Sequence, residues 1–336
     1  MERLNVAIVG ATGAVGETMR RILDERAFPA GDIRLLASPR SAGRRFTVGG
    51  KPRTVEVLDG FDFDDTQIAL FSTGSGISRA HAPRAAAAGA VVIDNTSAFR
   101  QEPNVPLVVP EVNRERIADG IGANIIANPN CVAIPLTVAC NPIYDAVGIE
   151  RINVATYQSV SGAGASGVKE LEAQAAQVVR GEEVDDFPVH PVQMAFNVVS
   201  HAWETYEDGY TEEESKVVQE TKKILEDDRL QVNPTCVRVP VYYGHSMALH
   251  IETRDPISPA QARDLLRDAE GVVLVEEGAP TAVDHAAGND GVFVGRVRRA
   301  VGHERGLNLW VVSDNVRKGA ALNSIQIAEE VRGLIG

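Results

Sequence analysis

The stretch Asn5-Val-Ala-Ile-Val-Gly-Ala-Thr-Gly-Ala-Val-Gly16 decides how the first part of the chain folds. Its apolar run, Asn5 to Val9, is typical of a buried parallel strand, and glycines at 10, 13 and 16 follow. A helical pattern then continues to about Arg26. Strand, glycine-rich turn and helix in this order form a dinucleotide-binding unit, with the pyrophosphate on the helix amino terminus. An ordinary glycine-rich turn remains the alternative, because the spacing is GxxGxxG rather than GxGxxG.

The segment after the second predicted strand, Ile33 to Ala37, bears on the choice of nucleotide. It reads Ser38-Pro-Arg-Ser-Ala-Gly-Arg-Arg45 and holds hydroxyls and three arginines, but no carboxylate. An NAD-binding unit usually places an acidic residue here for the ribose hydroxyls, whereas arginine suits a 2′-phosphate. The segment therefore favours NADP, and a solvated basic loop is the alternative.

Strands and helices alternate up to residue 127, which predicts a Rossmann-like, doubly wound parallel sheet. The polar loop Asp94 to Arg100 follows a strand, where ligands bind in such sheets, so Arg100 is a candidate anion ligand or a surface arginine. Beyond residue 127 the pattern predicts an α+β domain with a mixed, largely antiparallel sheet. Its expected strands are 152–160, 235–243, 245–253, 271–275, 292–299 and 307–313. We expect an NADP-binding domain at 1–127 plus 316–336, and a catalytic and dimerisation domain at 128–315.

The segment Asn128-Pro-Asn-Cys131 joins an apolar strand to an apolar helix. We expect Asn130 to cap this helix and Cys131 to lie in its first turn. The helix dipole and unpaired backbone N–H groups there favour the nucleophilic thiolate and can hold an oxyanion. The alternative is that Cys131 is a small buried apolar residue.

Further polar residues occur in positions that need a partner. Gln158 and Ser161 end a strand and open a glycine loop, and a buried amide must bond to backbone or to ligand. Arg238 lies in an apolar strand, where a buried arginine needs an anionic partner. His245 is either a capped surface residue or a general base. Glu213 and Lys216 share a helix face behind Thr211, which predicts a surface ion pair with a threonine cap.

Composition excludes several classes of function. A formal net charge of −13 argues against non-specific binding to nucleic acid or to an anionic membrane. We expect no signal peptide and no membrane span, because no apolar run is long enough for either. We also expect no metal site, because the sequence holds no CxxC, HxH or HxxxH. Three cysteines without a secretory signal favour the cytoplasm, and Cys140 and Cys236 are expected to be structural. Trp203 and Tyr206 are expected to anchor an irregular segment, 182–210.

Together the residues suggest acyl transfer to a thiolate coupled to hydride transfer. Ten stretches then resemble the aspartate-semialdehyde dehydrogenase family over essentially the whole length: VAIVGATGAVG, LASPRSAG, VVIDNTSAFR, VPLVVPEVN, NPNC, YQSVSGAG, EEESK, CVRVPVYYGHS, DGVFVGRVRR and VVSDNVRKGAALNSIQIAE. The resemblance implies NADPH-dependent conversion of aspartyl phosphate to aspartate semialdehyde in lysine, threonine and methionine synthesis. It also implies a homodimer.

The resemblance implies a role for each matched residue. Cys131 would be the nucleophile, His245 the general acid/base, and Gln158 would orient the acyl group. The implied substrate ligands are Arg238 for the carboxylate, Glu213 for the amino group, Arg100 and Lys216 for the phosphate, and Asn130. The implied cofactor ligands are Gly10, Thr12, Gly13, Ala14, Val15, Ser38, Arg40, Ser41, Ser161, Gly162 and Asn315, with Gln326 as a further candidate.

One departure from the family pattern adjoins the nucleophile. The family usually reads NPNCST and then Ile and Gln, whereas Val132, Ala133 and Pro135 stand here. Pro135 removes a backbone donor unless it falls in the first turn of the helix. A reductase of another acyl phosphate or acyl-CoA, such as the N-acetylglutamyl type, is one alternative. A silent NADP-binding paralogue is another.

Overall fold

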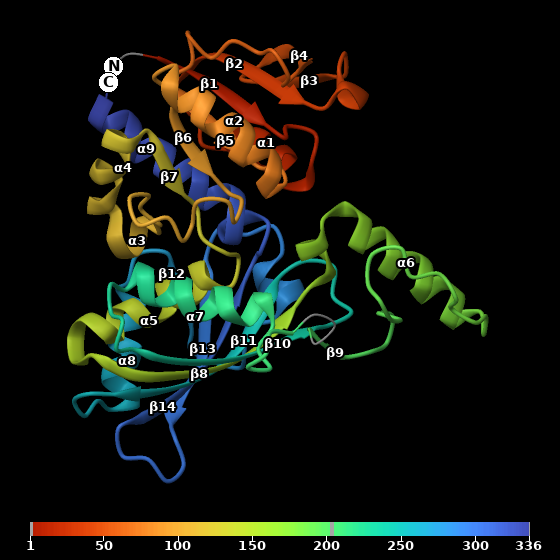
Figure 1. Cartoon of the computed structure of the whole chain (residues 1–336). Coiled ribbons are helices and arrows are strands. Elements are labelled where there is room, and N and C mark those ends of the chain that lie inside the picture. Colours follow the sequence, from red (N-terminus) through yellow and green to blue (C-terminus); the bar gives the residue numbers. More distant parts are fainter. Residues whose placement is uncertain (1–2, 202–204, 336) are drawn as a thin grey trace. The chain divides into compact units, whose positions relative to one another are not determined.

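The computed structural model describes residues 3–201 and 205–335 (Figure 1). The chain forms two compact units, and it crosses between them twice. Unit 1 comprises Met1–Asn130 and Ala320–Gly336, and unit 2 comprises Cys131–Gly319. The domain boundaries expected from the sequence, 127/128 and 315/316, lie three and four residues before these two crossings.

Unit 1 is built on a seven-stranded sheet of order β3-β4-β2-β1-β5-β6-β7. All neighbouring strands are parallel except β3 and β4, which form an antiparallel hairpin. The predicted parallel sheet is confirmed, and the hairpin was not predicted. The strands are β1 (Leu4–Val9), β2 (Ala30–Ala37), β3 (Arg45–Val48), β4 (Lys51–Val57), β5 (Ile68–Phe71), β6 (Val91–Asp94) and β7 (Ile125–Ala127).

Helices cover the sheet of unit 1 because its central strands are apolar on both faces. The C-terminal helix α9 packs against α1 and α4, and its apolar face joins the core around β1. Ile8 and Ile325 are both fully buried in that core. The helices of this unit are α1 (Ala14–Glu25), α2 (Ser75–Ala87), α3 (Pro110–Asn113), α4 (Ile117–Ala123) and α9 (Asn323–Ile335).

Unit 2 is built on a mixed seven-stranded sheet of order β12-β13-β14-β11-β8-β10-β9. The pairs β8–β10 and β12–β13 are parallel and the others are antiparallel, which confirms the predicted sheet. The strands are β8 (Ile149–Gln158), β9 (Val199–Ser200), β10 (Gln231–Arg238), β11 (His245–Thr253), β12 (Val272–Val275), β13 (Val292–Arg299) and β14 (Gly306–Ser313).

Three helices of unit 2 pack together on one face of this sheet (Figure 1). They are α5 (Ala133–Val147), α7 (Glu212–Ile224) and α8 (Pro259–Arg267). Helix α6 (Ala165–Val179) lies to the side of the sheet instead. In the ranges 3–201 and 205–335, no helix is long and apolar enough to cross a bilayer.

Two expectations about unit 2 are corrected. The strand expected at 235–243 ends at Arg238, so Pro240, which lacks an N–H, lies outside the ladder. Tyr206 is 54% exposed and does not anchor its segment. Trp203 lies outside the described residues.

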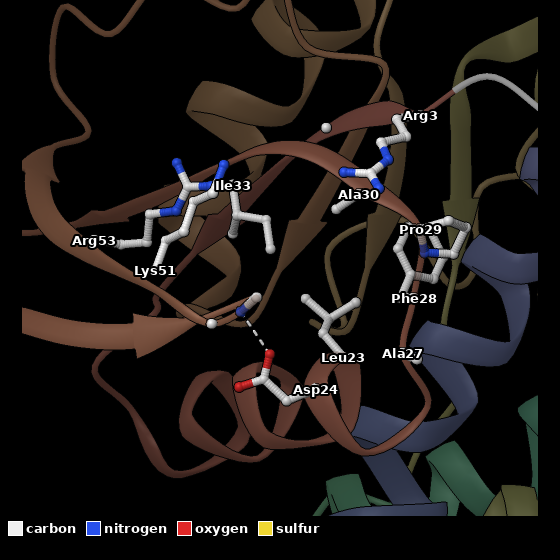
Figure 2. Close-up of a pocket in the computed structure, with 13 residues that line it drawn as sticks. Arg3, Leu23, Asp24, Ala27, Phe28, Pro29, Ala30, Ile33, Lys51 and Arg53 are labelled. Carbon is white, nitrogen blue, oxygen red and sulfur yellow. Dashed lines mark hydrogen bonds between the residues drawn. The ribbon is translucent and has the colours of Figure 1, made fainter.

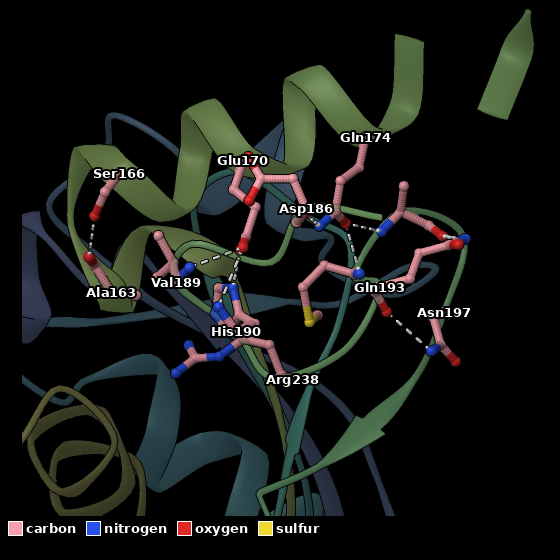
Figure 3. Close-up of polar contacts among 12 residues, drawn as sticks. Ala163, Ser166, Glu170, Gln174, Asp186, Val189, His190, Gln193, Asn197 and Arg238 are labelled. Carbon is pink, nitrogen blue, oxygen red and sulfur yellow. Dashed lines mark hydrogen bonds and ion pairs between the residues drawn. The ribbon is translucent and has the colours of Figure 1, made fainter. Parts of the chain in front are cut away.

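The long irregular segment before β9 is held by α6 (Figure 3). Glu170 Oε1 accepts the backbone N–H groups of Val189 and His190 at 2.9 and 3.2 Å, and its other oxygen pairs with His190 Nδ1. One helical turn later, Gln174 Oε1 accepts the N–H of Met194 at 2.7 Å. Two buried side chains thus replace the regular hydrogen bonds that this segment lacks.

Candidate active site

Cys131 lies just before helix α5. The helix begins at Ala133 with Val132 as its N-cap, so the prediction of Cys131 in the first turn is wrong by two residues. The N-cap position is Val132, so Asn130 is not the N-cap residue that the sequence predicted. Cys131 still adjoins the amino end of a helix of fifteen residues, where the dipole favours a thiolate.

The proline near the nucleophile sits where a helix tolerates it. Pro135 is the third residue of α5, and the first helical hydrogen bond runs from Leu136 N to Val132 O at 3.1 Å. A residue in the first turn has no intrahelical acceptor for its N–H, so Pro135 removes no hydrogen bond.

The thiol faces a buried imidazole. Cys131 Sγ lies 3.4 Å from Nε2 of His245, the first residue of β11. Cys131 is partly exposed, whereas His245 is fully buried. His245 is therefore a partner of the thiol, and the alternative of a capped surface histidine is wrong.

The second ring nitrogen of His245 reveals the tautomer. The backbone N–H of Ser159 donates to Nδ1 over 3.1 Å, and the Ser159 hydroxyl lies at the same distance. A backbone N–H can only donate, so Nδ1 must accept, and the proton of a neutral ring sits on Nε2. We assign the tautomer from this network, and it directs an N–H group at the sulfur.

The surroundings of His245 keep its ring neutral. Burial lowers the pKa of His245 well below its usual value, and the charge of Arg238 and the ring of His201 lower it further. A neutral Nε2–H group stabilises a thiolate by a hydrogen bond.

Arg238 is the most unusual cation of this cluster. It ends β10 opposite Gln158, is 8% exposed, and donates from Nη1 to Ser159 O at 2.7 Å. Its Nε has no hydrogen-bond partner among the described residues. A Cβ on Gly162 would lie 2.8 Å from Nη1, so the glycine makes room for the guanidinium. A buried arginine with a spare donor suits an anionic ligand.

Glu213 and Gln158 extend this cluster. Gln158 Nε2 donates to Glu213 Oε1 and to Thr156 Oγ1, each at 3.3 Å. Lys216 pairs with Glu212 at 2.7 Å, so the predicted ion pair between Glu213 and Lys216 is wrong. The Thr211 cap is confirmed.

A short loop after β14 contacts Cys131 at one end and residues around His245 at the other. Asn315 Oδ1 accepts the N–H of Gly244, next to His245, and the hydroxyls of Ser159 and Ser161 at 3.0 to 3.2 Å. At the other end of the loop, a Cβ on Gly319 would lie 3.1 Å from both Cβ and O of Cys131.

Asp314 holds this loop in shape. Its Oδ1 accepts the N–H groups of Val316 and Arg317 at 2.8 Å, and its backbone oxygen accepts that of Gly319. Ser159, Asp314 and Gly319 were not predicted from the sequence as site residues. Ser159 carried a signal, a hydroxyl at a strand end beside a glycine loop, but the other two act through backbone contacts.

The other cysteines are structural. Cys140 and Cys236 are fully buried, and burial raises the pKa of each thiol to about 12. Cys131 is therefore the thiol suited to nucleophilic chemistry.

In unit 1 the glycine turn leaves β1 as expected for a nucleotide site. Gly10 has φ of +87°, and a Cβ there would lie 2.4 Å from Ser72 O. Exposed Gly13 is the N-cap of α1, whose first residues are Ala14 and Val15. As a glycine, the N-cap offers no side chain to the backbone N–H groups of this first turn. A bound pyrophosphate would satisfy such groups.

The loop after β2 meets that turn. Thr12 Oγ1 donates to Ser41 Oγ at 3.2 Å, which joins two predicted cofactor ligands. Ser38 and Arg40 are exposed, and Arg40 makes no hydrogen bond or ion pair with any residue that the structure describes. Gln326 donates to Glu111 at 2.8 Å, so its amide is engaged within unit 1.

Arg100 is buried in unit 1 beside Asn128. Its Nε donates to Asn128 O and its Nη2 to Asn95 O, each at 2.9 Å. These bonds fix the guanidinium. Asn130, next to the thiol in sequence, is 8% exposed.

Comparison with known proteins identifies the family. A family model described as "Semialdehyde dehydrogenase, NAD binding domain" matches residues 5–120, and one described as "Semialdehyde dehydrogenase, dimerisation domain" matches 140–318. "Aspartate-semialdehyde dehydrogenase 2" of Vibrio cholerae is 54% identical over 332 residues, which cover 98% of this chain and 97% of that protein.

The chain belongs to the aspartate-semialdehyde dehydrogenase family. The Shewanella violacea member of this family is 53% identical over 330 residues, which cover 98% of this chain and 97% of its own. The crystal structure of aspartate semialdehyde dehydrogenase II from Vibrio cholerae matches with a TM-score of 0.98 at 52% identity, over the full length of both chains. A second structure of that enzyme, complexed with ASA, matches equally well.

Proposed function

We propose that this chain catalyses the NADPH-dependent reductive dephosphorylation of L-aspartyl 4-phosphate to L-aspartate 4-semialdehyde, through a thioester on Cys131. The proposal rests mainly on the 3.4 Å contact between Cys131 Sγ and His245 Nε2, with buried Arg238 in the same unit. The complex of the Vibrio cholerae relative with ASA, at 52% identity, supports the same ligand here. The reaction would serve lysine, threonine and methionine synthesis.

Sulfur would enter and leave the reaction as a thiolate. It attacks the acyl carbon, the bond from that carbon to the phosphate oxygen breaks, and phosphate departs with the bonding electrons. When bound, NADPH would supply a hydride to the carbonyl carbon of the thioester, and the aldehyde forms only when the thiolate then leaves. The carbon–sulfur bond then breaks and restores the thiolate, so Cys131 needs no base in this direction.

The proposed work of His245 follows from its tautomer. Its Nε2–H group donates to the thiolate, which stabilises sulfur both before attack and as the leaving group. Removing a thiol proton would need the other tautomer, which the Ser159 N–H opposes. The family implies a general acid/base at His245. With this tautomer, we propose that His245 donates a hydrogen bond to the sulfur and does not remove its proton.

The proposed substrate contacts assign each charge a partner. Arg238 would bind the carboxylate, Glu213 would bind the amino group, and Gln158, which contacts Glu213, would orient the acyl group. Arg100, Lys216 and Asn130 would hold the phosphate and the acyl end of the substrate.

We propose NADP as the cofactor because the loop after β2 offers Ser38, Arg40 and Ser41 but no carboxylate. The glycine turn, from Gly10 to Val15, would hold the pyrophosphate. Ser161, Gly162 and Asn315 are proposed as further cofactor ligands.

We also propose a homodimer, since a matching family model is described as a dimerisation domain. A reducing compartment such as the cytoplasm would keep the Cys131 thiol free.

The assay is phosphate-dependent formation of NADPH from L-aspartate 4-semialdehyde and NADP. We expect turnover with this aldehyde at least tenfold above N-acetylglutamate semialdehyde, and none without phosphate. Turnover of another aldehyde alone would replace the substrate, and turnover of none would indicate a silent NADP-binding paralogue.

A further inference from the structure

A cavity of about 450 Å³ opens in unit 1, away from the glycine turn. It lies where β2 begins, at Ala30 and Gly31, and where α1 ends, at Leu23 and Asp24. The glycine turn lies at the other end of β1, whose six residues span about 20 Å at the usual strand rise. The cavity is therefore separate from the proposed nucleotide site, and its size is that of a small-molecule pocket.

The floor of the cavity is apolar. Leu23, Phe28 and Ile33 line it and are 3%, 9% and 4% exposed. These side chains come from the end of α1, the following loop and β2, which all belong to the core of unit 1. The floor is thus preformed and offers contact to an apolar group.

The rim of the cavity is cationic. Figure 2 shows Lys51 and Arg53 on one side and Arg3 on the other. Asp24 is the carboxylate of the lining, and its Oδ1 already accepts the N–H of Gly49 at 2.6 Å. Asp32 pairs with Arg53, which leaves Lys51 and Arg3 as the rim cations that favour an anion in a chain of net charge −13.

Arg53 is held in place at this rim by an ion pair. Its Nη1 pairs with Asp32, but its buried Nε has no hydrogen-bond partner among the described residues. This nitrogen has no exposed surface, so Arg53 contributes its charge to the rim rather than this donor.

We propose that this cavity binds a small carboxylate that carries a short aliphatic or phenyl group. The carboxylate meets Lys51, Arg53 and Arg3, and the apolar group covers Leu23, Phe28 and Ile33. Inorganic phosphate alone leaves the floor uncovered, and a neutral apolar molecule offers no negative charge to Lys51 and Arg3.

Isothermal titration of the full-length protein tests this site with three probes: 4-phenylbutanoate, its neutral analogue 4-phenylbutanamide, and inorganic phosphate. We expect saturable binding of 4-phenylbutanoate, and binding at least about fivefold weaker for the other two. Lys51→Gln, on an exposed hairpin, should weaken the binding of 4-phenylbutanoate about fivefold. Ala30→Leu should abolish it by filling the cavity. The matched control is Lys169→Gln, an exposed lysine of α6.

Three results would each overturn the proposal. They are no binding of 4-phenylbutanoate, equal binding of the amide or of phosphate, and unchanged binding in Lys51→Gln. The last result would assign the ligand to another cation, such as Arg238. If circular dichroism shows that Ala30→Leu does not fold, Arg3→Gln replaces it. We expect Arg3→Gln to weaken the binding of 4-phenylbutanoate about fivefold, as for Lys51→Gln. No arm of the test depends on turnover, so it stands apart from the proposed reaction.

Discussion

Nε2 of His245 lies 3.4 Å from Sγ of Cys131, and the opposite nitrogen of the same ring accepts the backbone N–H of Ser159. The two contacts together determine which nitrogen carries the proton. They make His245 a hydrogen-bond donor to the sulfur. The proposed reaction depends on this bond, because it stabilises the Cys131 thiolate.

The tautomer of His245 can be observed directly. We predict that ¹⁵N-histidine NMR of the free protein finds His245 neutral and protonated on Nε2 throughout the range from pH 6 to 8. His245→Gln assigns the signal by its loss. A neutral ring protonated on Nδ1 would contradict the donor role, because Nε2 would then face the thiol as an acceptor.

Gly319 is predicted to position the nucleophile. A methyl group there would lie 3.1 Å from Cβ and O of Cys131, so Gly319→Ala should shift the sulfur by a few tenths of an ångström. We expect kcat to fall about tenfold and alkylation of Cys131 by iodoacetamide to slow, with NADP affinity unchanged.

The matched control for Gly319 is Gly76→Ala. Gly76 lies in α2, and a Cβ there would meet no atom within 4 Å. The control should keep the activity and alkylation rate of the wild type. If Gly319→Ala keeps both as well, the packing of Gly319 does not position Cys131.

The preference for NADP is predicted to depend on Arg40. This exposed cation lies beside Ser38 and Ser41, where a 2′-phosphate would bind. Arg40→Ala should lower kcat/KM for NADP at least about tenfold and leave that for NAD nearly unchanged. Arg79→Ala, an exposed arginine of α2, is the control. An unchanged NADP/NAD ratio in Arg40→Ala would dismiss the argument from the 2′-phosphate.

Stability is predicted to fall as the solution becomes acidic, because two buried histidines resist protonation. Burial lowers the pKa of His201 to about 4, with a contribution from Arg238, and lowers that of His245 well below its usual value. Between pH 6.5 and about 4 the unfolded chain binds more protons than the folded one, so the free energy of unfolding decreases as pH falls. His201 alone accounts for up to about 3 kcal/mol.

Urea unfolding at several pH values measures this slope. His201→Asn should flatten it, whereas His303→Asn, which alters a side chain 36% exposed, should not. An equal slope in His201→Asn would refute the contribution of His201.

The sequence predicted the elements whose residue pattern is strong. The apolar run before Gly10 predicted β1, and the expected cap Thr211 marked the start of α7. The hairpin of β3 and β4 was missed because its residues are largely exposed and polar, although Gly49-Gly50 is a typical turn.

The candidate site was predictable in residue type but not in geometry. Cys131 stood out because a thiol at a helix start is activated, and Arg238 because a buried arginine needs an anionic partner. His245 stood out as a possible general base. The tautomer of His245 depends on a backbone N–H just after β8, eighty-six residues earlier, which no local pattern encodes. The ion pair of Lys216 was misassigned because Glu212 and Glu213 both lie within reach of it on a helix.

The most direct test of the central claim is a phosphate-free reaction of the enzyme with L-aspartate 4-semialdehyde and NADP. The account predicts a burst of one NADPH per active site, and intact-mass and peptide analysis should find one aspartyl group on Cys131. Cys131→Ser should show neither the burst nor the label while it still binds NADP. A normal burst in Cys131→Ser, or an aspartyl group on another residue, would contradict the thioester mechanism.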